Sequence, residues 1–172
     1  YSLHIEYGDG RLEHKEFLAE AGKDPRRMLA ERLCHDIPKD VCSLAYNMSF
    51  EKRIIRGLAA LYSDLTDHLL NIHDNMKDLM LPFSKQSYYS AAMQGSYSIK
   101  YVLPALYPDN PELAYSNLEQ VHHGQEASSA YLDLCNQRTE EAAETRKNLL
   151  KYCGLDTYAM VKVLAKLREV AK

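Results

Sequence analysis

A short apolar stretch that passes directly into a helical pattern constrains the fold of this chain most. Residues 41–46, Val-Cys-Ser-Leu-Ala-Tyr, are bounded by polar residues, which is the pattern of a buried parallel strand. Apolar residues at helical spacing follow it, namely Ile54, Ile55, Leu58 and Leu61. A strand that passes into a helix in this way indicates an α/β fold.

The first residues predict a β-hairpin. Residues 1–7 alternate between apolar and polar side chains, Gly8-Asp9-Gly10 supplies a tight turn, and residues 11–17 can run back as a second strand. The remaining patterns predict a buried strand over 78–81 and helices that begin near Pro25, Asp64, Ile99, Gln125 and Thr139. The helix from Ile99 is expected to end at Pro104, and the polar connector over 108–124 to hold at most a short helix around 117–120.

Composition bounds the domain organisation and the location. With 172 residues, 46% of them hydrophobic, the chain is expected to form a single domain over residues 1–172. The net charge of -3 gives no basic field that would indicate nucleic acid from composition alone. The four cysteines form no C-x-x-C pair, which predicts reduced, mostly buried thiols in a cytoplasmic protein. Because no apolar run approaches the ~20 residues that span a bilayer, no membrane partner is expected.

Three side chains are candidates for chemistry from their positions alone. Tyr152 and Asp156 are four residues apart, so a helix places the phenol and the carboxylate one turn apart on one face. Glu51 follows the apolar strand at its carboxyl end, where open α/β sheets build their sites. Each has an ordinary alternative, because amphipathic helices often carry such Tyr and Asp pairs and the helix dipole favours a first-turn glutamate.

Two further segments contain residue types that can bind ligands. Gly95-Ser-Tyr-Ser98 precedes a helix, and its backbone N–H groups can face an anion, although ordinary helix capping uses the same residues. His122-His123 suggests a metal, but neighbouring histidines point apart on either regular element. We therefore expect no metal at the second segment.

Three segments stand out together, namely Tyr46-Asn-Met-Ser-Phe-Glu51, Gly95-Ser-Tyr-Ser-Ile-Lys100 and Leu150-Lys-Tyr-Cys-Gly-Leu-Asp-Thr157. They resemble the DnaQ-like exonucleases of the ribonuclease H-like superfamily, in the DEDDy branch whose third motif is Tyr-x-x-x-Asp. More narrowly, they resemble the bacterial family DUF2779, and this resemblance extends over nearly the whole chain. It implies a ribonuclease H-like mixed sheet, a hairpin plus parallel strands flanked by helices. It also implies a metal-dependent 3′-5′ exonuclease that acts on single-stranded DNA or RNA.

The resemblance implies roles for individual residues. Two divalent cations, Mg²⁺ or Mn²⁺, hold the scissile phosphate in such enzymes and need clustered carboxylate oxygens. By motif, Glu51 and Asp156 would bind metal, and Tyr152 would orient or activate the attacking water. Glu51 stands where the family usually has aspartate, and Asp78 is a candidate auxiliary acid. The residues expected to contact the substrate are Asn47, Phe50, Ser96, Ser98 and Lys100.

A first motif, Asp-x-Glu on the central strand, is also implied. The nearest spacing is His4-Ile5-Glu6, which is either a degenerate first motif or part of the hairpin, with the central strand upstream of Tyr1. On the second alternative the chain lacks the first central strand, binds metal weakly and has no nuclease activity by itself. Its bare strand edges would then be closed by direct pairing, by an upstream strand or by a second copy in a homo-oligomer. The alternative function is a non-catalytic module that binds nucleic acid or protein and keeps the nuclease fold.

Overall fold

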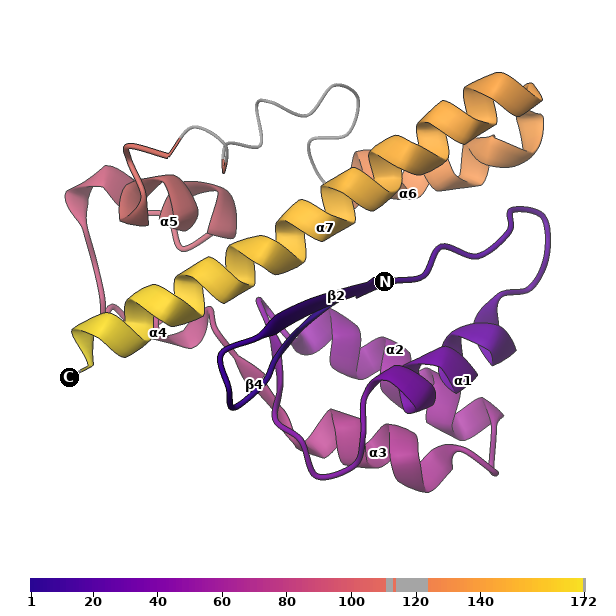
Figure 1. Cartoon of the computed structure of the whole chain (residues 1–172), viewed down its shortest axis with the longest axis horizontal. Coiled ribbons are helices and arrows are strands. Elements are labelled where there is room, and N and C mark those ends of the chain that lie inside the picture. The colour runs from indigo at the N-terminus through magenta and orange to yellow at the C-terminus, as the bar shows by residue number, and fades with distance from the viewer. Residues whose placement is uncertain (111–112, 114–123, 172) are drawn as a thin grey trace. The chain divides into compact units, whose positions relative to one another are not determined.

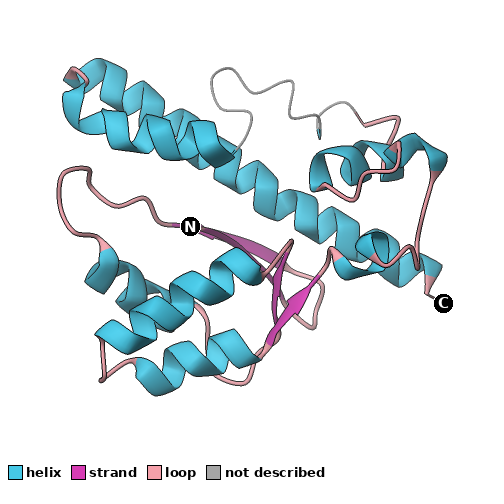
Figure 2. Cartoon of the chain, turned by 180° about the vertical axis from the view of Figure 1, so that it is seen from behind, coloured by secondary structure: helices cyan, strands magenta, loops and turns pink. Residues whose placement is uncertain are grey.

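The computed structural model describes residues 1–110, 113 and 124–171, which form two compact units (Figure 1). Unit 1 consists of Tyr1–Lys23 and Lys100–Lys172, and unit 2 of Asp24–Ile99. Helices make up most of the described chain (Figure 2). The strands form two small sheets, one antiparallel and one parallel, so the chain is a mixed α/β protein. The single domain over 1–172 stays a prediction, and the connector helix and His122-His123 lie outside the described residues.

Unit 2 is a helical unit built on one short parallel strand pair. In chain order its elements are α1 (Arg26–Asp36), β3 (Ser43–Ala45), α2 (Ser49–Leu61), α3 (Thr66–Asp74), β4 (Met76–Asp78), α4 (Leu81–Ser84) and the 3-10 turn η1 (Ala91–Met93). The buried side chains of its core are Ala30, Ala45, Ile55, Leu58, Ala59, Leu69, Ile72 and Met76. The strand predicted over 41–46 and the helix after it are confirmed as β3 and α2.

The second strand of this pair begins and ends earlier than its sequence pattern predicts. A strand over 78–81 was expected, whereas β4 spans Met76–Asp78 and pairs with β3 so that Ala45 lies opposite Asp78. The Asp78 carboxylate accepts a hydrogen bond from the Met80 N–H at 2.9 Å, which turns the chain, and a one-turn helix follows at Leu81. The local side-chain bond therefore ends the strand at the residue where it was expected to start.

Unit 1 combines the predicted hairpin with the last helices. Its elements are β1 (Ser2–Glu6), β2 (Leu12–Glu16), α5 (Ile99–Leu106, apart from its first residue), α6 (Gly124–Asp133), the 3-10 turn η4 (Leu134–Asn136) and the 32-residue α7 (Thr139–Val170). The hairpin is confirmed, with His4 opposite His14. Among the described residues β1 pairs only with β2, and β3 only with β4. These strands therefore form no single mixed sheet.

Helix α5 continues through a proline that was expected to end it. Pro104 lies inside α5, which ends at Leu106. The side chains of Val102 and Leu103 are fully buried and that of Leu106 is 8% exposed. Buried side chains on both sides of the proline stabilise the helix against the loss of one backbone hydrogen bond.

Polar contacts attach α7 to the rest of unit 1. The Arg146 guanidinium donates to the carbonyl oxygens of Leu18 (2.7 Å) and Ala19 (2.8 Å), just after β2. Near the other end, the Tyr107 hydroxyl donates to the Lys162 carbonyl at 3.0 Å. Charge-assisted bonds of the first kind are among the stronger ones in proteins, so α7 and the hairpin are held in a defined register.

Two further sequence expectations concern membrane-spanning helices and the burial of the cysteines. In the part of the chain that the structure describes, no helix combines the length and the apolar character needed to cross a bilayer. The four cysteines have free thiols, but Cys42 and Cys135 are exposed and Cys34 and Cys153 are half-buried, so the expectation of mostly buried thiols is wrong.

Candidate functional site

The turn from β3 into α2 is organised by one carboxylate. Asn47 has a positive φ of 65°, a left-handed conformation that asparagine tolerates better than most residues. Asp78 Oδ1 accepts from the Asn47 N–H at 2.9 Å, and Oδ2 accepts from the Met48 N–H at 3.1 Å. With the Met80 N–H, three backbone donors converge on the Asp78 side chain. Asp78 thus joins the carboxyl ends of β3 and β4 to the start of α2.

Glu51 lies in the first turn of α2, where the strand-to-helix argument places it. Its side chain is half-buried, and its Oε2 atom is buried with no hydrogen-bond partner. Burial raises the pKa of the Glu51 carboxyl, and the negative charge of Asp78 acts in the same direction. A buried carboxylate oxygen without a donor has a vacant lone pair that a cation or a water can use.

Replacing Glu51 with glutamine should stabilise the chain at neutral pH in the presence of a chelator. The raised pKa means that, as pH rises from the ordinary glutamate pKa to the higher folded-state value, the unfolded chain ionises first and stability falls. Above that window the wild type carries a buried charge that Glu51→Gln lacks. We expect a melting temperature higher by about 2–4 °C at pH 7.5 and no difference at pH 4.

Asp67→Asn is the matched control for this measurement. Asp67 is an exposed acid in the first turn of α3, so its replacement removes the same charge from an equivalent helical position. It should not raise the melting temperature, because this carboxylate is not buried. A pH-independent effect of Glu51→Gln would contradict the assigned cause.

Phe50 precedes Glu51 and is displayed on the surface. The residue is 59% exposed, and the Arg53 guanidinium carbon lies 5.4 Å from the centre of its ring. An exposed aromatic face beside a cation is a surface on which a nucleobase can stack.

The second predicted motif lies close to this turn. Tyr46, the last residue before the turn, donates a hydrogen bond from its hydroxyl to the Tyr97 carbonyl oxygen at 2.7 Å. Ser96 Oγ accepts from the Ser98 N–H at 3.2 Å, an ordinary local capping contact. Unit 2 thus brings the Ser96–Ser98 segment next to the end of β3, whereas Lys100 belongs to α5 in unit 1.

The third motif is on α7 in unit 1. Tyr152 is buried, Asp156 is half-buried, and the two side chains are hydrogen-bonded. Burial raises the pKa of the Tyr152 phenol, and the Asp156 charge, that hydrogen bond and the charge of Glu126 add to the effect. At neutral pH Tyr152 is therefore a neutral phenol that donates to the Asp156 carboxylate.

A buried amide lies one turn before Tyr152. Asn148 is 7% exposed, and its Nδ2 has no hydrogen-bond partner. Because Asn148, Tyr152 and Asp156 recur at four-residue spacing, they follow one face of α7.

His4 and Glu6, the candidate first motif, both contact α7. His4 Nδ1 lies 2.8 Å from the Thr157 hydroxyl, and its ring stacks on His14 with centroids 4.4 Å apart. Glu6 forms an ion pair with Arg168. Burial lowers the pKa of His4, as does the charge of His14.

The structure groups the site residues within each unit. Asn47, Phe50, Glu51 and the segment 96–98 lie in unit 2, while Tyr152 and Asp156 lie in unit 1. The approach of Glu51 to Asp156 stays a prediction. No group of three or more His, Cys, Asp or Glu side chains arranged to hold a metal is found over residues 1–110, 113 and 124–171.

The sequence did not predict the roles of two residues, Asp78 and Glu126. Asp78 was considered only as an auxiliary acid, although an aspartate at the end of a strand can bond to nearby backbone N–H groups, and this local signal was available. Glu126 has no such signal. It influences Tyr152 only because α6 packs against α7.

Comparison with known proteins yields one match. The family model described as "Domain of unknown function (DUF2779)" matches residues 1–98, which is 98 of the 172 residues. This match is shorter than the nearly complete resemblance expected, and the segment with Tyr152 and Asp156 lies outside it. No curated protein and no solved structure matched the chain.

Proposed function

The chain belongs to the DUF2779 family, and we propose that it is a ribonuclease H-like 3′-5′ exonuclease domain that uses divalent cations to hydrolyse single-stranded DNA or RNA. The observation that carries the proposal is the Glu51 carboxylate, half-buried at the carboxyl end of β3 with its Oε2 unpartnered. The carboxylate accepts a hydrogen bond from its own backbone N–H, whereas Oε2 is buried without a donor and is left for a cation.

The donor set fits Mg²⁺ or Mn²⁺, which prefer carboxylate oxygens. Glu51 and Asp156 would hold the cation, whereas the Asp78 oxygens already accept three backbone N–H groups. When bound, such a cation supplies a water of lowered pKa and stabilises the leaving 3′ oxygen.

Tyr152 has a positioning role in this proposal. Its raised pKa makes the phenol a poor base at neutral pH, so it does not remove a proton from water. Its hydroxyl donates to Asp156, which fixes the carboxylate rotamer, and its oxygen still has lone pairs to orient a water.

Substrate contacts follow from the surface around Glu51. Phe50 offers an exposed ring for stacking on the terminal base, and Arg53 beside it adds a positive charge. Lys100, Ser96 and Ser98 remain the proposed phosphate contacts by their motif.

Cation binding by this chain tests the proposal. Millimolar Mn²⁺ should raise its melting temperature by about 2–4 °C, because a ligand that binds only the folded state stabilises it. Asp156→Asn should abolish the shift, since it removes one ligand charge. The measurement is thermal unfolding with and without Mn²⁺ at constant ionic strength.

Asp133→Asn provides the matched control. Asp133 is an exposed acid at the end of α6 whose side chain caps nothing, so this variant should keep the full Mn²⁺ shift. If neither the wild type nor the variants respond to Mn²⁺, the non-catalytic interaction module becomes the better account of the chain.

A further inference from the structure

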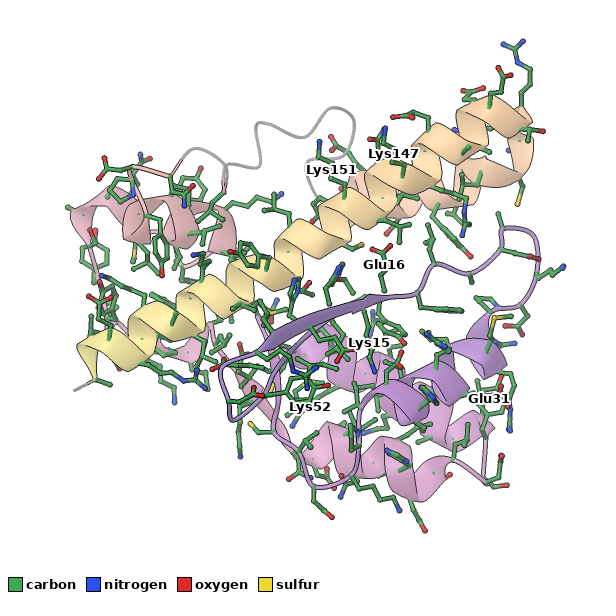
Figure 3. All side chains as sticks on the ribbon, viewed as in Figure 1. Lys15, Glu16, Glu31, Lys52, Lys147 and Lys151 are labelled. Atoms are coloured by element: carbon green, nitrogen blue, oxygen red, sulfur yellow. The ribbon has the colours of Figure 1, made fainter. Side chains whose placement is uncertain are left out.

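An open groove of about 580 Å³ lies between β2 and α7 in unit 1. Among its lining residues are His14, Glu16, Arg146, Lys147, Lys151 and Gly154. Figure 3 labels Glu16 on β2 and the two lysines on α7, and it shows Glu16 on the side of β2 toward α7, with Lys15 on the other side. Because side chains alternate along a strand, Lys15 lies outside the groove.

The groove carries a surplus of positive charge. Arg146, Lys147 and Lys151 contribute three cations, and Glu16 contributes one carboxylate. Glu144, which does not line the groove, forms an ion pair with Lys147 at 3.4 Å, so the positive surplus is one charge. The chain as a whole has a net charge of -3, so the groove is a positive region on a chain that is negative overall. A groove with such a surplus attracts anions with more than one charge.

The frame of the groove is held in place. Arg146 donates to the carbonyls of Leu18 and Ala19 at 2.7 and 2.8 Å, which ties the chain after β2 to α7. His14 Nε2 lies 2.8 Å from Ser2 Oγ on the neighbouring strand. The two lysines therefore stand on a fixed frame, about 6 Å apart along the helix axis.

This groove is distinct from the Tyr152 and Asp156 pair. Successive residues of a helix are rotated by about 100°, so Lys151 and Tyr152 face different directions, as do Lys147 and Asn148. Any anion in the groove is therefore held independently of the proposed cation.

We propose that the β2–α7 groove binds the phosphate backbone of single-stranded nucleic acid, as a second contact away from the site of hydrolysis; this rests on the proposed function. Lysines are point charges without the bidentate geometry that selects one base or one phosphate group. The two lysines in succession along α7 fit neighbouring phosphates of a strand. The groove contributes affinity that does not depend on base sequence.

Oligonucleotide binding without metal tests the groove. Fluorescence anisotropy with a labelled single strand is measured in EDTA over a range of salt concentrations. Lys147→Gln/Lys151→Gln should lower the slope of log K against log salt by about 1.4, from ~0.7 per lost contact. At 0.1 M salt this corresponds to a loss of affinity of about 25-fold.

The control variant removes two lysines elsewhere. Lys39→Gln/Lys166→Gln has the same net charge and should bind like the wild type, which also excludes an effect of charge alone. The binding is measured in EDTA, without the cation, so a failure of the exonuclease proposal leaves this result unaffected.

Three outcomes would overturn the groove proposal. One is an unchanged salt slope in Lys147→Gln/Lys151→Gln, and another is the absence of any metal-free binding by the wild type. The third is displacement of the strand by inorganic phosphate at equal phosphate concentration, which would assign the groove to a small anion. In each case the exonuclease proposal would still be tested separately, by the shift in melting temperature with Mn²⁺ and the loss of that shift in Asp156→Asn.

Discussion

Asp78→Asn is expected to lower the free energy of unfolding by about 3 kcal/mol. The two Asp78 oxygens accept three backbone N–H groups, from Asn47, Met48 and Met80. Asparagine keeps one acceptor oxygen and places an NH₂ group against a backbone donor, so at least one N–H loses its partner. Bonds to a charged acceptor are worth about 1.5–3 kcal/mol each, and the loss is shared by the turn and both strand ends.

Urea unfolding measures this loss, and amide hydrogen exchange locates it. Exchange at Asn47, Met48 and Met80 should accelerate more than exchange in α3, because the bonds removed are local to the turn. Asp67→Asn, on the exposed face of α3, should change the free energy of unfolding by less than about 0.5 kcal/mol. A similarly small change for Asp78→Asn would show that the turn is held by other contacts.

Asp156→Asn is expected to abolish nuclease activity in a protein extended upstream of Tyr1. An extension of ~30–40 residues is enough for a strand and its connection, and with an Asp-x-Glu motif it would complete the ligand set. Such a protein should shorten single-stranded oligonucleotides from the 3′ end with Mg²⁺ or Mn²⁺. Removing the Asp156 charge should lower the rate on the order of 1,000-fold, since a metal ligand stabilises charge that develops in the transition state.

Two further variants, one in α7 and one at the end of α6, sharpen this measurement. Tyr152→Phe removes the hydroxyl that fixes Asp156 but leaves the carboxylate, so it should cost about 10–100-fold, the range for residues that orient a metal ligand. Asp133→Asn should retain full activity. An extended protein with an intact Asp-x-Glu that leaves labelled DNA and RNA untouched across several metals would contradict the exonuclease proposal.

Local patterns accounted for most of the secondary structure. The alternation in residues 1–7 and the glycines after it predicted the hairpin, and the apolar run before Asn47 predicted β3. These signals act over a few residues, where side-chain periodicity and turn propensity decide the backbone. The error at β4 arose from a local bond, in which Asp78 accepts from the Met80 N–H and ends the strand. The error at Pro104 arose because buried side chains around the proline outweighed its local preference.

The candidate residues could be identified from the sequence, but their burial, hydrogen bonds and protonation could not. Motif spacing named Glu51, Tyr152 and Asp156 as candidates, and the family match over 1–98 includes the position of Glu51 but not those of Tyr152 and Asp156. Spacing says nothing about which oxygen is buried without a donor, or about the proton that Tyr152 retains. Those properties depend on side chains that are distant in sequence, such as Asp78 for Glu51 and Glu126 for Tyr152.

The sequence by itself determined the hairpin, the strand that passes into α2, and the identity of the candidate acids, because each depends on neighbours within a few turns of the chain. Only the tertiary structure decided that Asp78 binds the start of α2 and that a cationic groove lies between β2 and α7. It also decided that Glu51 has a buried oxygen without a donor. Burial and hydrogen-bond partners at these places come from segments that meet only when the chain folds.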